Sequence, residues 1–401
     1  MRYRIFYATG PGNIIQAHKH WSEGREDPSQ VSITFSSQFE EFCLEIGAEA
    51  YITAYHGKKA IYHEGPFTLE HRPKPMPGAT GIRYHLAELL YCLGLFLTAI
   101  WFRATVAVLD SGVSHFFIFA LFRLAGIKTI IVLHNALWPS GFPPTRIVPR
   151  MIAKLDSFFF RWLPIATIGV SPECIQQVRQ LTNGRHTPLY QIRAQFRRDY
   201  FAAIPAPPPH DQRPFRIMYV GRINRFKGVF DILEMAKRVE AEAPGRVRWE
   251  MCGSGPDLEE LTRLQDEMGL KHIVFVRGWT SPKDLPDVYT RSHVSIVPTR
   301  GSCSEGEGLP MTAAEAILAG RPVITNAVVP ALAVLRPACI EAQTDNVDSY
   351  VKAILRLIDD PTLYCTLCKA CPDLQQQFYD REQGFKAILK KILNPKIPAK
   401  I

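Results

Sequence analysis

Two glutamates stand eight positions apart in the glycine-rich stretch 295–325. Glu307 lies on a loop, and Glu315 lies inside the helix that Pro310 is expected to open. A carboxylate on a loop can accept hydrogen bonds from sugar hydroxyls, and one a little over two helical turns further on can accept a pair from a ribose. The two carboxylates are therefore expected to have different roles in binding a sugar-bearing ligand.

Backbone donors gather near the start of the same helix. The N–H groups of Gly308, Leu309 and Met311 suit a diphosphate, whereas Pro310 has no N–H to donate. A helix N-terminus also carries partial positive charge, which favours an anion. This segment is therefore expected to meet the phosphates of a nucleotide.

A basic loop follows the strand expected at residues 216–220. Gly221 and Arg222 end that strand, and Lys227 and Gly228 come just before an amphipathic helix. Arginine can bind a diphosphate in a bidentate manner, and lysine acts as a compact point charge. On this segment alone, a solvated basic loop is an equal alternative.

Glycine-rich turns follow three other expected strands. Gly253 follows the strand at 248–252, and Gly278 with Trp279 follows the strand at 273–277, where the indole can frame a base. The first turn of the chain contains Gly10, Gly12 and Asn13. Glycine lets the backbone approach a ligand closely, so a phosphate or sugar oxygen can reach these N–H groups. The alternative for the first turn is structural punctuation without a ligand.

Apolar, β-rich runs alternate with amphipathic helical patterns in both halves, which is typical of parallel sheets covered by helices on both faces. Ten strands are expected, at residues 4–8, 50–54, 105–109, 129–133 and 166–170, and at 216–220, 248–252, 273–277, 294–298 and 322–325. Five prolines among residues 202–214 exclude a helix and indicate an extended connector. The fold class expected is α/β, with two Rossmann-like, doubly wound domains.

The chain of 401 residues is longer than one hydrophobic core usually serves. We expect an N-terminal domain at 1–203 and a C-terminal domain at 214–377, with a helix at 378–395 packing back onto the first. Open α/β sheets bind ligands beyond the carboxyl ends of their strands. The two domains should therefore face each other across a shared cleft.

The composition is that of a globular protein, with 47% apolar and 21% charged residues. The nine cysteines are scattered and odd in number, without the spacing of a disulfide framework. The N-terminus lacks the long apolar core and cleavage site of a signal peptide. These features lead us to expect a cytoplasmic location.

The net charge of +9 is concentrated in the first half of the chain. Residues 101–200 carry 12 Lys and Arg but only 4 Asp and Glu, with apolar and aromatic residues between them. Three alternatives stay open: a solvated surface, a face that meets anionic lipid, and a nucleic-acid site. We expect no nucleic-acid partner and allow a peripheral contact with the inner face of a membrane.

One uncharged apolar run, residues 89–102, is a candidate membrane span. It is 14 residues long and is bounded by Glu88 and Arg103. That is too short to cross a bilayer as a helix. A helix buried against a sheet is the favoured interpretation, and an interfacial segment is the alternative.

From about Phe215 to Pro361 the chain resembles the retaining GT-B glycosyltransferases of family 4. The signature is the Glu-x7-Glu element of Glu307 and Glu315, followed by Ala-Ile-Leu-Ala-Gly-Arg-Pro-Val-Ile. Before it come Gly-Arg with a downstream Lys-Gly, a Gly-x-Gly-Pro turn and a Val-Pro-Thr strand end. Each element alone is weak evidence, and their order across some 150 residues is the strong point.

The resemblance implies roles for individual residues. Arg222 and Lys227 would hold the donor diphosphate, Glu307 the transferred sugar and Glu315 the ribose. His134 ends a strand where the family commonly places a histidine near the reacting sugar. Gly10 and Gly12 fit its first glycine-rich loop, and with Asn13 this loop would contact the acceptor or a phosphate.

Two departures from the family pattern bear on the substrates. Residues 191–198 replace the usual Pro-Asn-Gly element, and residues 327–332 replace the acidic and glycine residues that often follow the Pro-Val-Ile strand. These changes put the identity of donor and acceptor in doubt more than the class of reaction.

No Asp-x-Asp motif occurs in the sequence, so no metal and no cofactor are expected, and the nucleotide-sugar is a substrate. His18 and His20 have no partner at a recognised zinc spacing, so we favour cleft-lining rings over a metal pair. Arg222 and Lys227 would instead offset charge on the leaving diphosphate.

The resemblance implies a metal-independent, retaining hexosyltransferase. It would act on a glycan or a lipid-linked saccharide in surface polysaccharide biosynthesis. Alternatives are a GT-B epimerase or phosphorylase, and a catalytically silent module that binds sugar nucleotides.

Overall fold

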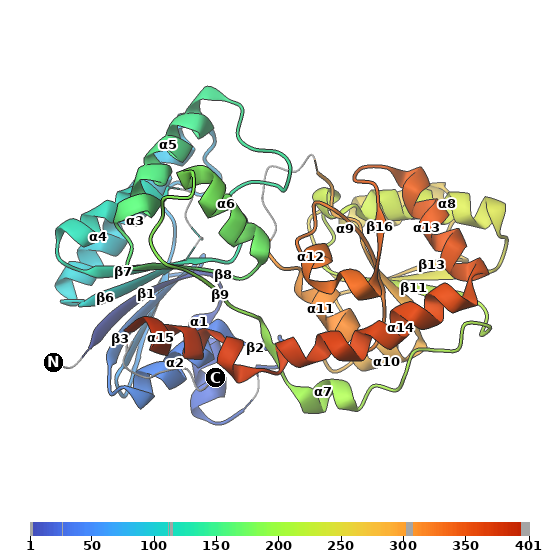
Figure 1. The fold of residues 1–401 in the computed structure, drawn as a ribbon, viewed down its shortest axis with the longest axis horizontal. Coiled ribbons are helices and arrows are strands. Elements are labelled where there is room, and N and C mark those ends of the chain that lie inside the picture. Colours follow the sequence, from blue (N-terminus) through green and yellow to red (C-terminus); the bar gives the residue numbers. More distant parts are fainter. Residues whose placement is uncertain (1–2, 26, 111, 113–114, 302–307, 394–401) are drawn as a thin grey trace.

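The computed structural model describes residues 3–25, 27–110, 112, 115–301 and 308–393. It contains two large sheets, one in each half of the chain, and each sheet has helices on both faces (Figure 1). A short antiparallel pair, β2 (Ser32–Ile33) with β10 (Gln195–Phe196), lies outside these sheets.

The N-terminal sheet has the strand order β4-β5-β3-β1-β6-β7-β8-β9. The strands are β1 (Arg4–Pro11), β3 (Glu49–Tyr55), β4 (Ala60–Glu64), β5 (Phe67–Arg72), β6 (Val106–Asp110), β7 (Lys128–Leu133), β8 (Ala166–Gly169) and β9 (Leu189–Gln191). All neighbours pair in parallel except β4 with β5. The central strands are apolar and buried because helices cover both faces.

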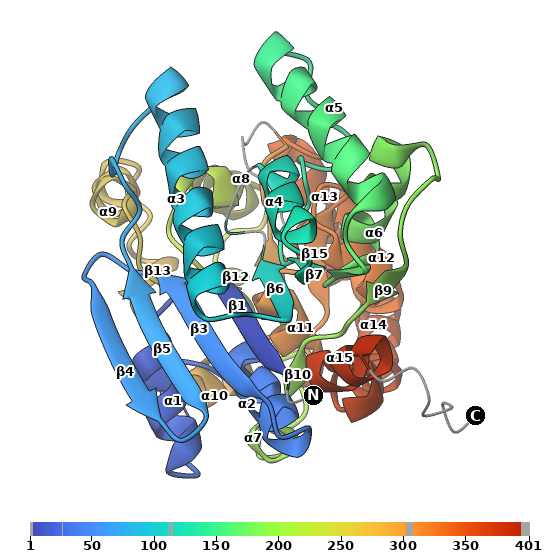
Figure 2. The same cartoon turned by 90° about the vertical axis from the view of Figure 1, so that its left-hand side faces the viewer.

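Helices cover the two faces of this sheet in separate groups (Figure 2). One face carries α1 (Ile14–Ser22) and α2 (Phe35–Glu45). The other carries α3 (Gly81–Trp101), the 3-10 helix η1 (Phe116–Phe119), α4 (Ala120–Leu124), α5 (Ile147–Trp162) and α6 (Pro172–Thr182). Right-handed crossovers explain this division, because connections that run in opposite directions along the sheet pass over opposite faces.

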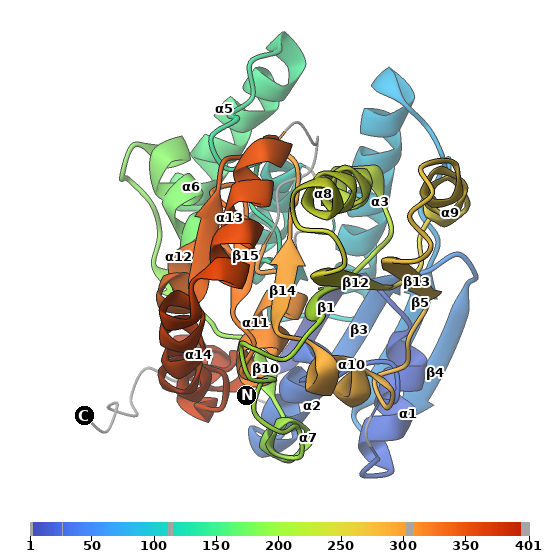
Figure 3. The same cartoon turned by 90° about the vertical axis from the view of Figure 1, so that its right-hand side faces the viewer.

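The C-terminal sheet has the order β13-β12-β11-β14-β15-β16 and is parallel throughout. Its strands are β11 (Phe215–Val220), β12 (Val247–Cys252), β13 (Val274–Gly278), β14 (Val294–Val297), β15 (Val323–Asn326) and β16 (Cys339–Ala342). Its helices are α8 (Val229–Glu242), α9 (Leu258–Glu267), α10 (Leu285–Arg291), α11 (Met311–Leu318), α12 (Ala331–Leu335), α13 (Val347–Asp359) and α14 (Pro361–Gln375). Figure 3 shows α8 and α13 on one side of this sheet and α10 and α14 on the other.

The connector between the sheets follows α7 (Arg198–Ala202) and is held by a buried arginine. The Arg321 side chain is fully buried and donates a hydrogen bond of 2.7 Å to the carbonyl of Pro205. It also donates to the carbonyl of Ser292, the residue that follows α10. Burial lowers the pKa of this guanidinium to about 10, and several carbonyl acceptors offset the cost of burying its charge.

All ten expected strands are confirmed, with ends displaced by at most three residues. Six others were missed, namely β2, β4, β5, β9, β10 and β16. In β5 the polar residues Glu70 and His71 are buried, so the strand lacks an apolar signature. In β4 the side chains are largely exposed on the sheet edge, where an apolar run is not needed.

After α14 the chain returns to the N-terminal sheet (Figure 1). Helix α15 (Phe385–Leu393) packs on α2, and the Phe385 N–H donates to Gln38 Oε1 at 2.9 Å. The helix begins later than the expected residue 378, because Asp380 caps a separate turn by accepting a hydrogen bond of 3.0 Å from the Glu382 N–H. Residues 394 and 395 of the expected helix lie outside the described residues.

The packing of α15 against the N-terminal half can be tested with two substitutions on this helix. Phe385 is fully buried against the rings of Tyr7 and Phe35, so Phe385→Ala is expected to cost about 3–5 kcal/mol of unfolding free energy. Lys390 makes an exposed ion pair with Glu45, so Lys390→Ala is expected to cost about 0–1 kcal/mol. Urea unfolding of both variants measures the difference, and equal losses would contradict this packing.

Candidate functional site

A cavity of about 750 Å³ opens at the carboxyl edge of the N-terminal sheet. Its walls are the turn after β1, helix α1, residues 27–36, the end of β6 and the residues after β7. Met311, at the start of α11, lines it from the C-terminal half of the chain. The cavity therefore lies where loops from both sheets meet.

Asp110 is the polar centre of the cavity wall. It ends β6, it is 7% exposed, and its Oδ2 accepts a hydrogen bond of 3.2 Å from the Gly10 N–H. The same oxygen lies 2.9 Å from His134 Nε2. The His134 ring is also in contact with the ring of Phe35, with centroids 4.5 Å apart. Asp110 thus links the end of β1 to the residue that follows β7.

The structure brings together the predicted residues of the N-terminal half, because Gly10, Gly12, Asn13 and His134 all line this cavity. The Gly12 N–H donates to the Tyr55 carbonyl at 3.2 Å, and Asn13 Oδ1 caps α1 by accepting from the Gln16 N–H. Asp110 was missed. Its signal is a single carboxylate at the end of the apolar run Val-Ala-Val-Leu, at the edge of a sheet where ligands bind.

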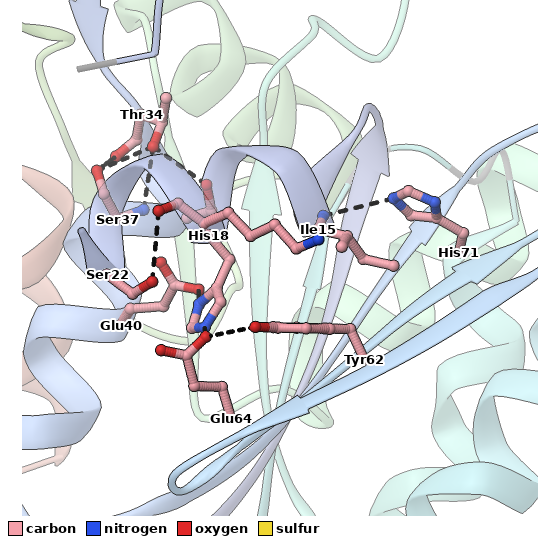
Figure 4. Close-up of polar contacts among 11 residues, drawn as sticks. Ile15, His18, Ser22, Thr34, Ser37, Glu40, Tyr62, Glu64 and His71 are labelled. Atoms are coloured by element: carbon pink, nitrogen blue, oxygen red, sulfur yellow. Dashed lines mark hydrogen bonds and ion pairs between the residues drawn. The ribbon is translucent and has the colours of Figure 1, made fainter. Parts of the chain in front are cut away.

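Helix α1, one wall of the cavity, is fastened by a buried ion pair (Figure 4). His18 Nδ1 lies 2.7 Å from Glu40 Oε1 on α2, and both side chains are 1% exposed. On the other side of the ring, His18 Nε2 lies 3.5 Å from Glu64 on β4. His20 lines the cavity, but His18 does not, so only one of the two expected histidine rings faces it.

Three predicted glycines meet where the strands of the C-terminal sheet end. The Gly253 N–H donates a hydrogen bond of 2.7 Å to the Gly278 carbonyl. A Cβ atom on Gly253 would lie 1.8 Å from the Gly221 carbonyl oxygen, so no other residue fits there. The ends of β11, β12 and β13 are therefore joined backbone to backbone.

The basic loop after β11 has a fixed backbone. The Tyr219 hydroxyl donates to the Arg222 carbonyl at 2.7 Å, and Asn224 Oδ1 accepts from the Phe226 N–H. Arg222 is exposed and Lys227 is half-buried, with its Nζ 5.5 Å from the Phe226 ring centroid. Neither cation lines the cavity described above.

The described residues before α11, Gly308 to Pro310, make a contact between the two halves. A Cβ atom on Gly308 would lie 1.7 Å from the His134 carbonyl oxygen, so the two backbones are in direct contact. Leu309 beside it is buried, and Met311 reaches the cavity. Glu307, the residue expected to hold the transferred sugar, lies outside the described residues.

Glu315 is buried one helical turn beyond Met311. It is 8% exposed, and its Oε2 accepts a hydrogen bond of 3.2 Å from the Tyr289 hydroxyl. Burial raises the pKa of Glu315 from 4.5 to about 7, although this hydrogen bond lowers it in part. By contrast, Trp279 is 66% exposed and does not line the cavity.

Among the described residues, no three His, Cys, Asp or Glu side chains are grouped so that they could hold a metal ion.

The raised pKa of Glu315 predicts a pH dependence of stability. The folded state holds a proton that the unfolded chain releases above its pKa of 4.5, so this contribution is complete below pH 4.5 and is lost as the pH rises through about 7. Glu315→Gln cannot titrate, and the variant should lose about 3 kcal/mol less unfolding free energy than the wild type across this range.

Urea unfolding at several pH values measures this difference. Asp156, whose pKa burial also raises to about 7, titrates equally in both proteins and cancels. Parallel pH profiles for the two proteins would contradict the burial of an ionisable Glu315.

The family model described as Glycosyl transferases group 1 matches residues 201–376. The lipopolysaccharide 1,6-galactosyltransferase of Salmonella typhimurium is 30% identical over 125 residues, which cover 30% of this chain and 32% of that protein. The alpha-D-kanosaminyltransferase of Streptomyces kanamyceticus is 25% identical over 266 residues, 63% of this chain and 67% of that protein. The aligned part thus spans about a third of the first relative and two thirds of the second.

Solved structures share the fold over nearly the whole chain. Sucrose-phosphate synthase from Thermosynechococcus elongatus superposes with a TM-score of 0.69 at 14% identity, covering 98% of both chains. HepE from Anabaena, solved in complex with UDP, superposes with a TM-score of 0.67 at 14% identity, covering 98% of this chain and 99% of the other. The fold is GT-B, and residues 201–376 form a Glycosyl transferases group 1 domain.

Proposed function

We propose that this protein is a retaining glycosyltransferase of the family 4 type, which moves a sugar from a nucleotide-sugar to a glycan or lipid-linked saccharide. The observation that carries the proposal is the contact of Gly308 with His134, beside a cavity of about 750 Å³. It joins a Glycosyl transferases group 1 domain to a pocket large enough for a saccharide. The names of the two relatives, a galactosyltransferase and a kanosaminyltransferase, support transfer of a hexose.

The donor is a nucleotide-sugar whose phosphates meet the C-terminal half of the chain. In this proposal Arg222 and Lys227 bind the diphosphate, together with the N–H groups of the loop before α11. Glu315 accepts hydrogen bonds from the ribose, and Trp279 borders the base. The complex of HepE with UDP supports a uridine nucleotide as the first donor class to try.

The acceptor occupies the cavity in the N-terminal half. Asp110, His20 and His134 offer it hydrogen-bonding groups, and Phe35 offers a ring face of the kind that packs against sugars. Glu307 keeps the role that its sequence position predicts, contact with the transferred sugar. A surface polysaccharide or its lipid-linked precursor is the acceptor class that the lipopolysaccharide relative supports.

Transfer breaks the bond between the anomeric carbon and the diphosphate oxygen and forms a bond from that carbon to the acceptor oxygen. The acceptor approaches on the face that the diphosphate leaves, so the configuration is retained. The acceptor proton passes to the departing phosphate. In this metal-independent mechanism Arg222 and Lys227 stabilise the negative charge that builds on the diphosphate.

The test compares three cations of one loop. Arg222→Gln and Lys227→Gln should each lower kcat about 100-fold, because each removes positive charge from the leaving group. Arg225→Gln is the matched control: Arg225 is on the same loop but pairs with Glu260 at 2.6 Å, so its loss should change kcat less than about twofold. Release of nucleoside diphosphate from a panel of nucleotide-sugars, with lipopolysaccharide-derived acceptors, measures the rates.

Several outcomes would contradict the proposal. Turnover that requires inorganic phosphate would identify a phosphorylase, and an epimerised sugar would identify an epimerase. Nucleotide binding without turnover of any donor would identify a silent module. If NMR shows that the anomeric configuration of the product is inverted, the retaining mechanism is wrong, but the transfer of a sugar still stands.

A further inference from the structure

Helices α3 and α5 expose large apolar side chains that the core does not use, and we infer that this face binds the surface of an anionic lipid bilayer. The face consists of the outer sides of both helices and is called the α3/α5 face below. The inference does not rest on the proposed function, because binding to vesicles requires no turnover.

Helix α3 has two apolar sides. Ala87, Tyr91, Leu95 and Ala99 are buried against the sheet. On the outer side a second stripe repeats every three or four residues, and each member is between 39% and 86% exposed: Ile82, Leu86, Leu90, Leu93, Leu97 and Trp101. Such spacing places these side chains along one side of a helix. The favoured expectation of a helix buried against the sheet is therefore right for one side only.

Helix α5 repeats the arrangement. Phe159 and Phe160 are fully buried, while the outer stripe is between 50% and 78% exposed and consists of Ile147, Met151, Leu155, Phe158 and Trp162. Exposed apolar patches of this extent mark interaction surfaces in soluble proteins. Because both α3 and α5 carry an exposed apolar stripe, the stripes are a feature of this face and not of one helix.

The two stripes belong to one face of the molecule. Helices α3 and α5 cover the same face of the N-terminal sheet, with η1 and α4 between them (Figure 2). The rings of Phe116 on η1 and Phe160 on α5 are 5.2 Å apart, and the His85 ring of α3 is 5.1 Å from His115, which precedes η1. Leu124 on α4 adds an 81% exposed leucine to the surface between the helices.

The charges on this face select an anionic partner. Helices α3 and α5 are described in full, and their only carboxylates, Glu88 and Asp156, are 2% and 7% exposed. Glu88 pairs with Lys74 at 2.6 Å, and Asp156 accepts from the Phe117 N–H at 2.8 Å, so both are directed inward. The exposed charges of the two helices are cations: Arg83, Arg150 and Lys154. Apolar side chains flanked by exposed cations match a bilayer with anionic headgroups.

The geometry fits contact with a bilayer surface rather than a crossing. Helix α3, with 21 residues, is long and apolar enough to span a membrane by length and composition. However, its inner side is part of the core, and Glu88 is anchored there. A helix with one side in the protein and the other exposed lies along an interface. A second copy of the chain is a poorer occupant, because symmetric pairing would bring these cations against their own copies.

The test is flotation of the full chain with vesicles of phosphatidylcholine, with and without about 30% phosphatidylglycerol. The wild type should float with the anionic vesicles, and less so as salt is raised, since salt screens the cations. Met151→Asn with Phe158→Asn should weaken binding at least tenfold. Arg150→Gln with Lys154→Gln should weaken it about 25-fold, at about fivefold for each cation.

The matched control is Leu44→Asn with Ile61→Asn. Both residues are about half exposed, as Met151 and Phe158 are, but Leu44 lies on α2 and Ile61 on β4, away from the α3/α5 face. This variant should float like the wild type, and unchanged thermal unfolding shows that all variants fold. The inference is overturned if the wild type does not float with anionic vesicles at low salt, if the control loses binding as much as the α5 variants, or if the face is covered in a stable dimer.

Discussion

The contact of the Gly308 backbone with the His134 carbonyl is the constraint on which the rest of the site depends. It brings the loop before α11, in one half of the chain, onto the residue that follows β7 in the other. Only glycine allows this approach, because any side chain at position 308 would overlap the carbonyl oxygen. The site is thus assembled from two separate sheets, and its geometry depends on how the sheets are held together.

Three features hold that geometry. Arg321 binds the connector through the Pro205 carbonyl, and its charge is buried among carbonyl acceptors. Movement of the connector would leave the buried guanidinium with fewer acceptors, which is costly. Helix α15 returns from the second sheet and seats Phe385 in the first. Asp110 joins the Gly10 N–H and His134 at the cavity wall. Each feature uses a buried group. The first two connect the C-terminal half to the connector and to the N-terminal sheet, and the third positions His134, whose carbonyl contacts Gly308.

The sequence was sufficient for the parts of the fold that follow from apolar periodicity. Strands such as β6 and β7 are buried on both faces and are continuously apolar, so their positions were evident. The edge strand β4 was missed because its side chains are largely exposed. Its neighbour β5 was missed because Glu70 and His71 are buried and bonded to partners that only the fold supplies, such as the Tyr51 hydroxyl at 2.9 Å from Glu70.

For the site, the sequence placed Gly221, Gly253 and Gly278 at the ends of three parallel strands as ligand-binding turns, and only the structure shows that their backbones meet. Glycine spacing could not find Asp110, whose role depends on the distant residues Gly10 and His134. Nor could periodicity decide which side of α3 is covered, because both of its sides are apolar. That distinction arises only when the helix is placed on the sheet.

We propose that a nucleotide diphosphate binds between the basic loop after β11 and the buried Glu315. Calorimetric titration of the wild type and Glu315→Ala with UDP, GDP and ADP tests it most directly. One of these nucleotides should bind the wild type and bind Glu315→Ala at least tenfold more weakly, because the ribose loses its acceptor. If none binds at millimolar concentration, or if Glu315→Ala binds as the wild type does, the donor site lies elsewhere.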